Sequence, residues 1–186
     1  MSVQPIQVGP QRWLVPTTLG LVVLVTDQIT KLRVFATLGP HPYSKLIWLA
    51  GDWLSLVYAQ NTGVAFGLFQ NMPLLFTATS ILITTAAVYA YVYHLPNNSP
   101  WIQGTMGLIV GGALGNILDR LRLGYVVDFI SVGWWPVFNL ADSAITVGVT
   151  LLAVYLIFIG DEAAPVPHVP PRDDGLLSDL LNRDVD

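Results

Sequence analysis

The chain has 186 residues, of which 53% are hydrophobic and only 11% are charged. Because soluble domains carry roughly 25% charged residues, an ordinary water-soluble globule is excluded, and much of the surface must face lipid. The net charge of −4, with 8 basic residues, argues against a nucleic-acid partner. The absence of cysteine excludes disulfides, thiolate catalysis and cysteine-ligated metals.

Four apolar segments are long enough for a membrane-spanning helix, which needs about 20 residues. They run over residues 13–35, 73–94, 100–121 and 136–160. The first segment continues past the usual apolar run of a signal peptide and lacks a small-residue cleavage pattern. We therefore interpret it as a retained anchor, and the sequence predicts four spans.

The three connections between these segments differ in character. The first, residues 36–72, contains short runs rich in Trp, Val and Tyr, which favour two or three short strands at the membrane surface. The second, residues 95–99, is a short uncharged turn that makes a hairpin of its two spans. The third, residues 122–135, ends in two tryptophans, which are typical of the membrane interface.

The expected organisation is therefore all-α with a small β insertion. Residues 1–12 form an N-terminal segment, and residues 13–160 form the four-helix membrane unit with its β insertion at about 36–72. Residues 161–186 are acidic and Pro-rich, which predicts a largely disordered tail. The alternative for the tail is a short docked helix over 176–181.

The ionisable residues in or beside the spans are functional candidates, because each costs several kcal/mol in lipid. They fall near helix ends that emerge on one face, whichever way the chain is inserted: Asp27, Lys31, Asp119, Arg120 and Asp142. We expect Asp142 about two turns into the fourth span. The spacing of Asp27 and Lys31 predicts an ion pair that supports the bundle.

Two Asn-x-x-Asp patterns place a carboxamide one helical turn from a carboxylate, where it can orient the acid. These are Asn116 with Asp119 and Asn139 with Asp142. The third span also carries a small-residue ridge, Gly107, Gly111, Gly112 and Gly115. Such a ridge favours close helix packing, the alternative being a groove for an extended peptide.

Two carboxyl groups that share one proton can act as general acid and general base on a water molecule. Asp142 is one candidate, because it has small neighbours and no cation near it in sequence. Its partner is Asp128 or Asp119. Asp119 precedes Arg120, and a carboxylate held by a guanidinium is a poor base. Asp128 lies among apolar residues that raise its pKa, so chemistry favours Asp128 and assigns Asp119 to a bridge with an arginine.

Five segments resemble, in order, the motifs of bacterial lipoprotein signal peptidases, also called signal peptidase II. They are DQITK at 27–31, NTGVAFG at 61–67, GGALGNILDR at 111–120, VVDFI at 126–130 and FNLADSAIT at 138–146. The resemblance covers residues 13–160. It implies an aspartic endopeptidase of the bacterial inner membrane, with four transmembrane helices, both termini cytoplasmic and a small extracytoplasmic sheet.

The resemblance also implies the substrate and the site. The substrate is a prolipoprotein whose cysteine carries a diacylglyceryl group, cleavage falls just before that cysteine near the extracytoplasmic face, and globomycin is an inhibitor. Membrane lipid is the other partner, no metal or cofactor is required, and a monomer is expected to function. The implied catalytic pair is Asp128 and Asp142. The matching supporting or substrate-binding positions are Asp27, Lys31, Asn61, Gly63, Gly115, Asn116, Asp119, Arg120, Asn139 and Ala141.

The implied orientation disagrees with the count of basic residues. Three of the eight lie on the side of the N-terminus and five on the other side, which by the positive-inside rule puts the N-terminus outside. Several of those five flank or lie inside the spans, where pairing with carboxylates would remove them from the count of basic residues that determines orientation. We therefore follow the resemblance.

Two other functions are compatible with buried charges in a membrane protein. A proton-coupled small transporter uses intramembrane carboxylates as relays, but the chain lacks inverted repeats and carries its charges in one leaflet. A non-enzymatic scaffold leaves the two Asn-x-x-Asp patterns and the desolvated Asp128 without a role. The sequence favours the peptidase.

Overall fold

The computed structural model describes residues 10–63 and 72–159 of the chain. A short 3-10 helix over Pro10–Trp13 leads into the first of four α-helices. Their bounds are α1 Leu14–Leu38, α2 Pro73–Tyr93, α3 Pro100–Leu123 and α4 Leu140–Phe158. The predictions for the tail over residues 161–186 and for most of the N-terminal segment lie outside the described residues.

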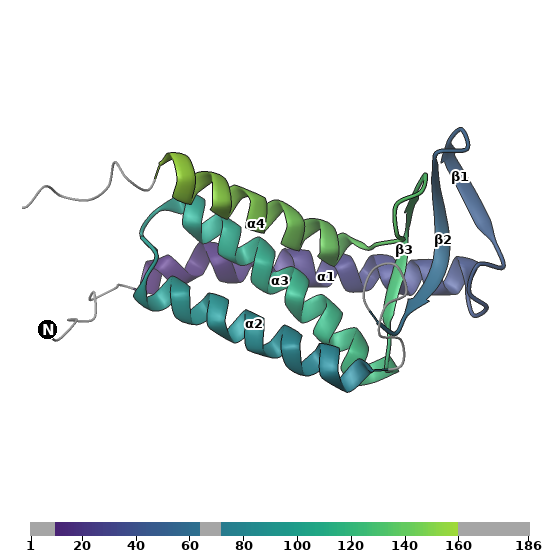
Figure 1. The fold of residues 1–186 in the computed structure, drawn as a ribbon, viewed down its shortest axis with the longest axis horizontal. Helices are drawn as coiled ribbons and strands as arrows, with labels where there is room; N and C mark the ends of the chain where they lie inside the picture. Colours follow the sequence, from purple (N-terminus) through teal and green to yellow (C-terminus); the bar gives the residue numbers. More distant parts are fainter. Residues whose placement is uncertain (1–9, 64–71, 160–186) are drawn as a thin grey trace, which may run out of the picture.

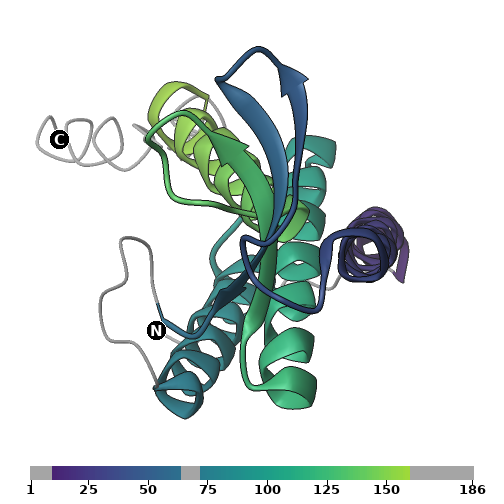
Figure 2. The ribbon, with the colours of Figure 1, turned by 90° about the vertical axis from the view of Figure 1, so that its right-hand side faces the viewer.

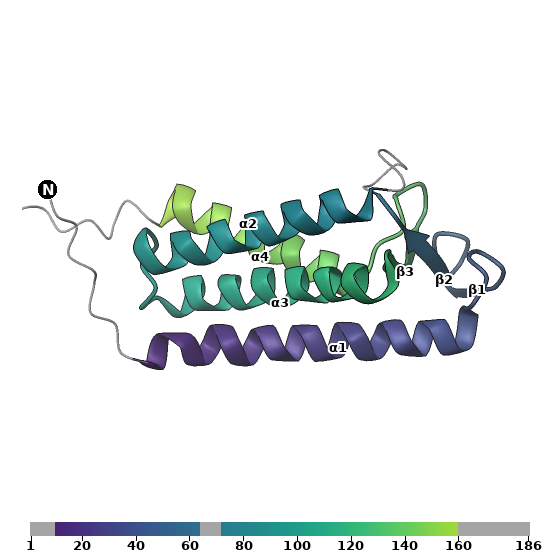
Figure 3. The same ribbon diagram turned by 90° about the horizontal axis from the view of Figure 1, so that it is seen from below.

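The helix α3 is the centre of the bundle. It packs against α1, α2 and α4, and Figure 3 shows it lying between α1 and α2. In the most apolar 18-residue stretch of α3, 61% of the residues are buried. The corresponding share for α2 is 11%. Large side chains on the outer helices therefore point away from the protein, as expected where the surrounding medium is lipid.

Three described helices, α2, α3 and α4, are long and apolar enough to cross a membrane. The prediction of four spans is thus confirmed for three of them by length and composition. The helix α1 has 25 residues but carries Asp27, Gln28, Lys31 and Arg33 in its second half, which lower its mean hydropathy. Its outward side chains, including Leu21, Val22 and Val25, are nevertheless apolar and exposed.

The start of α4 differs from the prediction. Residues before Leu140 are extended, and Phe138 pairs with Ile130 of the sheet, so the helix begins four positions later than the apolar segment at 136. Asn139 is the N-cap. The expectation that Asp142 lies two turns into this span is therefore wrong, because Asp142 is in the first turn.

A three-stranded antiparallel sheet covers one end of the bundle (Figures 1 and 2). The strands are β1 Leu46–Ala50, β2 Leu54–Asn61 and β3 Val126–Val132, in the order β1-β2-β3. Two strands come from the first connection, as predicted. The third comes from the third connection, which was not predicted, and it pairs Asp128 with Ala59 of β2.

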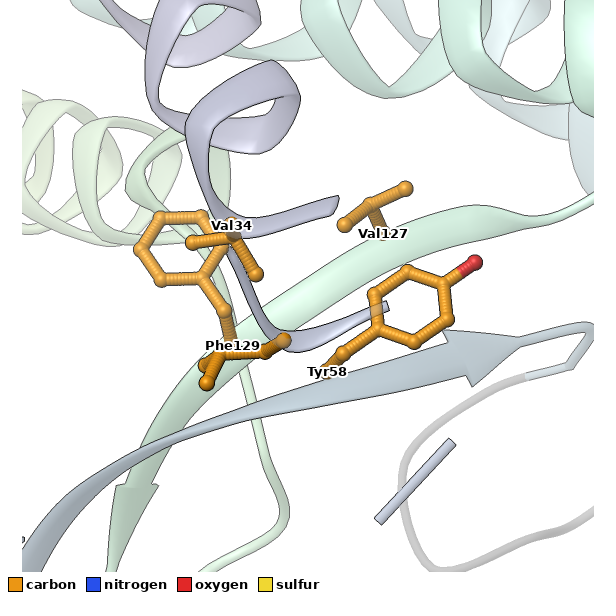
Figure 4. Packing of buried hydrophobic residues seen from close by; sticks show 5 residues of the cluster. Val34, Tyr58, Val127 and Phe129 are labelled. Atoms are coloured by element: carbon orange, nitrogen blue, oxygen red, sulfur yellow. The ribbon is translucent and has the colours of Figure 1, made fainter. Parts of the chain in front are cut away.

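The end of α1 supports the sheet through a small apolar core. Val34 and Leu38 pack with Tyr58, Val127 and Phe129, all of them buried (Figure 4). The hydroxyl of Tyr58 also lies 3.0 Å from that of Tyr125, within hydrogen-bond distance. Strands β2 and β3 are therefore fixed over the end of α1, which sets the position of Asp128 relative to the helices.

The glycine ridge of α3 serves helix packing. A Cβ atom added at Gly111 would lie 2.5 Å from the carbonyl oxygen of Gly20 on α1, and one added at Gly112 would lie 2.5 Å from that of Ala141 on α4. The two adjacent glycines thus allow close approach of two different helices. Packing occupies these positions, so the ridge is not a free groove there.

Candidate active site

A buried ion cluster joins α1 to α3. The Nζ atom of Lys31 lies 2.8 Å from Oδ2 of Asp27 and 2.9 Å from Oδ2 of Asp119. It also donates a hydrogen bond to Oδ1 of Asn116, at 3.1 Å. The three donors of the ammonium group are therefore all used, and the predicted pair of Asp27 with Lys31 is confirmed.

The expected bridge from Asp119 to an arginine is wrong. Neighbours in a helix sequence point about 100° apart, so the guanidinium of Arg120 does not follow Asp119 into the cluster. The cation that Asp119 binds is Lys31, which reaches across from α1. Arg120 is half-buried and acts electrostatically on Asp142, Asp128 and Asp119.

Both carboxylates of the cluster also hold backbone beside a candidate catalytic residue. Asp27 accepts a hydrogen bond from the backbone N–H of Ala141, at 3.1 Å, which is one of the free donors at the start of α4. Asp119 accepts one from the backbone N–H of Val127, also at 3.1 Å. Ala141 precedes Asp142 and Val127 precedes Asp128. The cluster around Lys31 therefore positions both candidates.

Asp142 is oriented by a capping box at the start of α4. Its backbone N–H donates to Oδ1 of Asn139, at 2.9 Å, and its Oδ2 accepts from the backbone N–H of Asn139, at 3.2 Å. Its Oδ1 accepts from the amide of Asn116, at 2.7 Å. A carboxylate in the first turn also interacts favourably with the helix dipole.

Asp128 projects from β3 and is 2% exposed. Its Oδ1 accepts a hydrogen bond from Nδ2 of Asn139, at 2.7 Å, and its Oδ2 accepts one from Nδ2 of Asn61, at 2.9 Å. Burial, followed by the nearby charge of Asp142, raises the pKa of Asp128 to about 7. A carboxyl group with this pKa carries a proton part of the time near neutral pH.

Asn139 links the two candidate acids. Its carboxamide oxygen holds the backbone of Asp142 and its Nδ2 group holds Asp128. The same Nδ2 group donates to Oδ1 of Asn116, at 3.1 Å. The predicted contact of Asn139 with Asp142 is thus confirmed. That of Asn116 with Asp119 is wrong, because the amide of Asn116 binds Asp142 instead.

The remaining positions from the sequence analysis support this network. The backbone N–H of Gly63 donates to Oδ1 of Asn61, at 3.1 Å, which fixes the amide that binds Asp128. One polar residue was missed, Gln28, whose Nε2 donates to Oδ1 of Asp119 at 2.9 Å. The sequence could have indicated Gln28, because an uncharged polar residue beside Asp27 inside an apolar span also needs a hydrogen-bond partner.

The absence of a side chain at Gly115 leaves room for the carboxylate of Asp27 in the ion cluster. A Cβ atom there would lie 2.6 Å from Oδ2 of Asp27. We expect Gly115→Ala to lower the free energy of unfolding by about 1–3 kcal/mol through overpacking, and to reduce activity by displacing Asp27. The measurement is unfolding in detergent together with a cleavage assay.

Gly104→Ala is the matched control on the same helix, because a Cβ atom there meets nothing within 4 Å. It is expected to stabilise α3 by up to about 1 kcal/mol through its better helix propensity. Equal effects of the two substitutions would contradict the packing role of Gly115.

The chemistry of this arrangement is that of acid and base. Two carboxyl groups lie at the junction of β3 and α4, held by three carboxamides and a buried ion cluster. Over residues 10–63 and 72–159 no group of three or more His, Cys, Asp or Glu side chains is arranged to hold a metal ion. The two carboxyl groups of Asp128 and Asp142, placed in this way, are suited to proton transfer.

Solved structures place this fold among bacterial membrane enzymes. One solved at 2.3 Å resolution superposes with a TM-score of 0.69 at 30% identity, covering 81% of this chain and 92% of its own. A second, at 28% identity, has the same TM-score and covers 86% and 99%. The likeness to these solved enzymes, together with a helical bundle that brings the buried Asp128 of β3 and the half-buried Asp142 of α4 to one junction, defines the chain as a membrane enzyme.

The particular family follows from the sequence match. Residues 19–158 match the family described as Signal peptidase (SPase) II, and the chain belongs to this family of proteases. The lipoprotein signal peptidase of Moorella thermoacetica is 40% identical over 149 residues, covering 80% of this chain and 97% of the relative. That of Rhodococcus jostii is 41% identical over 167 residues, covering 87% and 81%. Family membership favours the protease over the transporter.

Proposed function

We propose that this chain removes the signal peptide from prolipoproteins, with Asp128 and Asp142 as its catalytic pair. The relatives named lipoprotein signal peptidase support the reaction. The observation that carries the catalytic assignment is the single side chain of Asn139, which holds the Asp128 carboxyl group and the backbone of Asp142 together. No other two described carboxyl groups outside the ion cluster around Lys31 are linked in this way.

In the proposed mechanism, Asp142 is ionised and Asp128 carries the shared proton. Asp142 takes a proton from a water molecule as the water oxygen attacks the scissile carbonyl carbon. Asp128 gives its proton to the carbonyl oxygen. When the tetrahedral intermediate collapses, the C–N bond breaks and the leaving nitrogen takes the proton held by Asp142, while the hydroxyl proton returns to Asp128. The enzyme is regenerated and no covalent intermediate forms.

We further propose that the substrate cysteine carries a diacylglyceryl group and that cleavage falls just before it. The apolar outer faces of α2 and α4, with exposed Leu82, Ile83 and Ile157, leave acyl chains in contact with lipid while the peptide crosses the site. Globomycin is expected to inhibit this chain, as the resemblance implies. The chain is proposed to act as a monomer.

A fourth span, α1, completes the proposed membrane arrangement. The charges of Asp27 and Lys31 compensate each other inside the bundle, and the outward side chains of α1 are apolar. We place the sheet on the extracytoplasmic side of the inner membrane and both termini in the cytoplasm. Pairing of Lys31 with two carboxylates lowers the count of basic residues on the sheet side from five to four, against three on the other side. This weakens the opposing positive-inside signal without reversing it, so the proposed orientation rests on the family resemblance.

The test of the proposed reaction compares two substrates. Purified protein in detergent is mixed with a prolipoprotein carrying a diacylglyceryl-cysteine, or with the same prolipoprotein unmodified, and product masses are followed. We expect a cut just before the lipidated cysteine and little cleavage of the unmodified form. Cleavage elsewhere, or equal cleavage of both substrates, would contradict the proposal.

The raised pKa of Asp128 predicts how activity depends on pH. The acid must be protonated, so we expect the rate to fall above about pH 7, where Asp128 loses its proton. The hydrogen bond from Asn61 favours the charged form and lowers this pKa. Asn61→Ala therefore removes a lowering influence and should move the alkaline limb to higher pH.

The measurement is the pH dependence of kcat/KM for the wild type and Asn61→Ala, with tryptophan fluorescence as a check of folding. Gln60→Ala is a neighbouring control, because the side chain of Gln60 donates a hydrogen bond to the hydroxyl of Tyr58 and to neither acid. An alkaline limb that stays in place in Asn61→Ala, or moves to lower pH, would contradict the assignment of Asp128 as the acid.

A further inference from the structure

An apolar crevice lies at the end of the bundle opposite the sheet. Residues Trp13 and Pro16 at the start of α1 form one wall, Val88 and Tyr91 of α2 form the other, and Met106 and Val110 of α3 line the floor. The crevice is therefore lined by three helices, of which α3 lies between α1 and α2 (Figure 3). Its lining suits a hydrocarbon chain.

One arginine lies beside this crevice. The hydroxyl of Tyr91 donates a hydrogen bond to the backbone oxygen of Arg12, at 2.7 Å, and the rings of Trp13 and Tyr91 pack edge to face with centroids 5.3 Å apart. The positive charge of Arg12 also acts on Tyr91. Arg12 is thereby tied to two residues of the crevice wall.

The guanidinium of Arg12 lacks a counterion within the described part of the chain. Its Nε and Nη1 atoms are covered by protein, yet they have no hydrogen-bond partner there. The side chain as a whole is half-buried, so it remains reachable from outside. The described carboxylates have other places in the fold: Asp52 lies in the turn between β1 and β2, and the others belong to the candidate site and its ion cluster, namely Asp27, Asp119, Asp128 and Asp142. An unpaired, partly desolvated cation of this kind favours an anion from outside the bundle.

We propose that Arg12 and the crevice bind an anionic phospholipid. The phosphate pairs with the guanidinium of Arg12, and one acyl chain lies between α1 and α2. Trp13 and Tyr91 then sit at the depth where amphipathic aromatic rings are favoured. The charge and the apolar groove are adjacent, as they are in a phospholipid, which is why the pair indicates a lipid rather than a free anion.

The test measures lipid binding to the full-length protein by native mass spectrometry from detergent, with phosphatidylglycerol or phosphatidylcholine added. We expect the wild type to retain phosphatidylglycerol more tightly than phosphatidylcholine. Arg12→Gln should weaken phosphatidylglycerol binding about fivefold, the effect of one basic residue near a charged lipid surface. Arg33→Gln, at an exposed position near the other end of α1, is the matched control. Unchanged binding by Arg12→Gln would overturn the proposal.

Two further variants separate the possible occupants. Val88→Trp fills the crevice and should weaken binding of both lipids while leaving inorganic phosphate binding unaffected. If it weakens neither lipid, the crevice does not hold an acyl chain. The acidic residues of 161–186, seven in number, are a competing source of negative charge. If changing all seven to amides raises phosphatidylglycerol affinity, the tail is the occupant and the lipid proposal fails, whereas unchanged affinity supports the lipid.

Discussion

Asp128→Asn is expected to reduce the rate of prolipoprotein cleavage by at least about a hundredfold, within the range usual for loss of a general acid or base. The substitution keeps the shape of the side chain and removes its acidic proton. An amide at this position also meets the donor groups of Asn61 and Asn139 with only one acceptor oxygen. We expect Asp142→Asn to have a similar effect, because it removes the group that activates water.

Folding of the variant can be separated from its chemistry. Burial raises the pKa of Asp128 to about 7, so in the folded protein the group keeps its proton from about pH 4 to pH 7, where the unfolded chain has lost it. The contribution of Asp128 to stability therefore declines as the pH rises through this interval. Asp128→Asn removes this decline, so the unfolding temperature of the variant relative to the wild type should be higher at pH 8 than at pH 5.

Controls make the result specific. Asp52→Asn changes an exposed aspartate in the turn between β1 and β2, and it should leave cleavage and stability unchanged. Asp119→Asn tests the alternative acid. If Asp128→Asn cleaved at the wild-type rate while a folded Asp119→Asn were inactive, the proposed pair would be wrong.

Lys31→Met is expected to be the most destabilising of the changes considered. The methionine has a similar length, but it leaves Asp27 and Asp119 buried without their cation. Removing one partner of a buried ion pair typically costs about 3–5 kcal/mol. The free energy of unfolding in detergent should fall by about this amount, and activity should be lost with it because Ala141 and Val127 are no longer held.

Lys45→Met is the control, since Lys45 is exposed and, among the residues that the structure describes, its ammonium group donates only to the backbone oxygen of Thr37, at 3.5 Å. A second variant neutralises the carboxylates as well, combining Lys31→Met with Asp27→Asn and Asp119→Asn. With no unpaired charge left, it should regain most of the lost stability. A Lys31→Met protein within 1 kcal/mol of the wild type, on the scale of exposed ion pairs, would show that the cluster contributes little.

The sequence predicted which charged residues gather at one end of the bundle, but it did not predict correctly which of them bind each other. The gathering of Asp27, Lys31, Asp119 and Asp142 at one end followed from the alternation of spans, because that argument needs only helix ends. The predicted bridge from Asp119 to an arginine was wrong, because residues adjacent in sequence point in different directions around a helix. Lys31 belongs to another helix, but its side chain points toward Asp119 and binds it.

The strand β3 was missed for a related reason. Its sequence VVDFISV is apolar apart from Asp128 and Ser131, which fall on opposite faces, so it lacks the alternation by which an exposed strand is recognised. Its partner, β2, lies more than sixty residues earlier, as in the pairing of Asn61 with Val126. Long-range pairing of this kind is visible only in three dimensions. The start of α4 at Leu140 was missed for the same reason, because the apolar residue Phe138 pairs with Ile130 of the sheet and does not extend the helix.

The hydrogen bond from Ala141 to Asp27 connects positions 114 residues apart and so joins the first helix to the last. During biosynthesis, the ribosome delivers α4 after α1, α2 and α3, and Asn139 and Asp142 arrive with it. A nascent chain with only three helices inserted therefore holds Asp128 without its counterpart. If Asp128 and Asp142 are the catalytic pair, hydrolytic competence therefore arises only after α4 has been made.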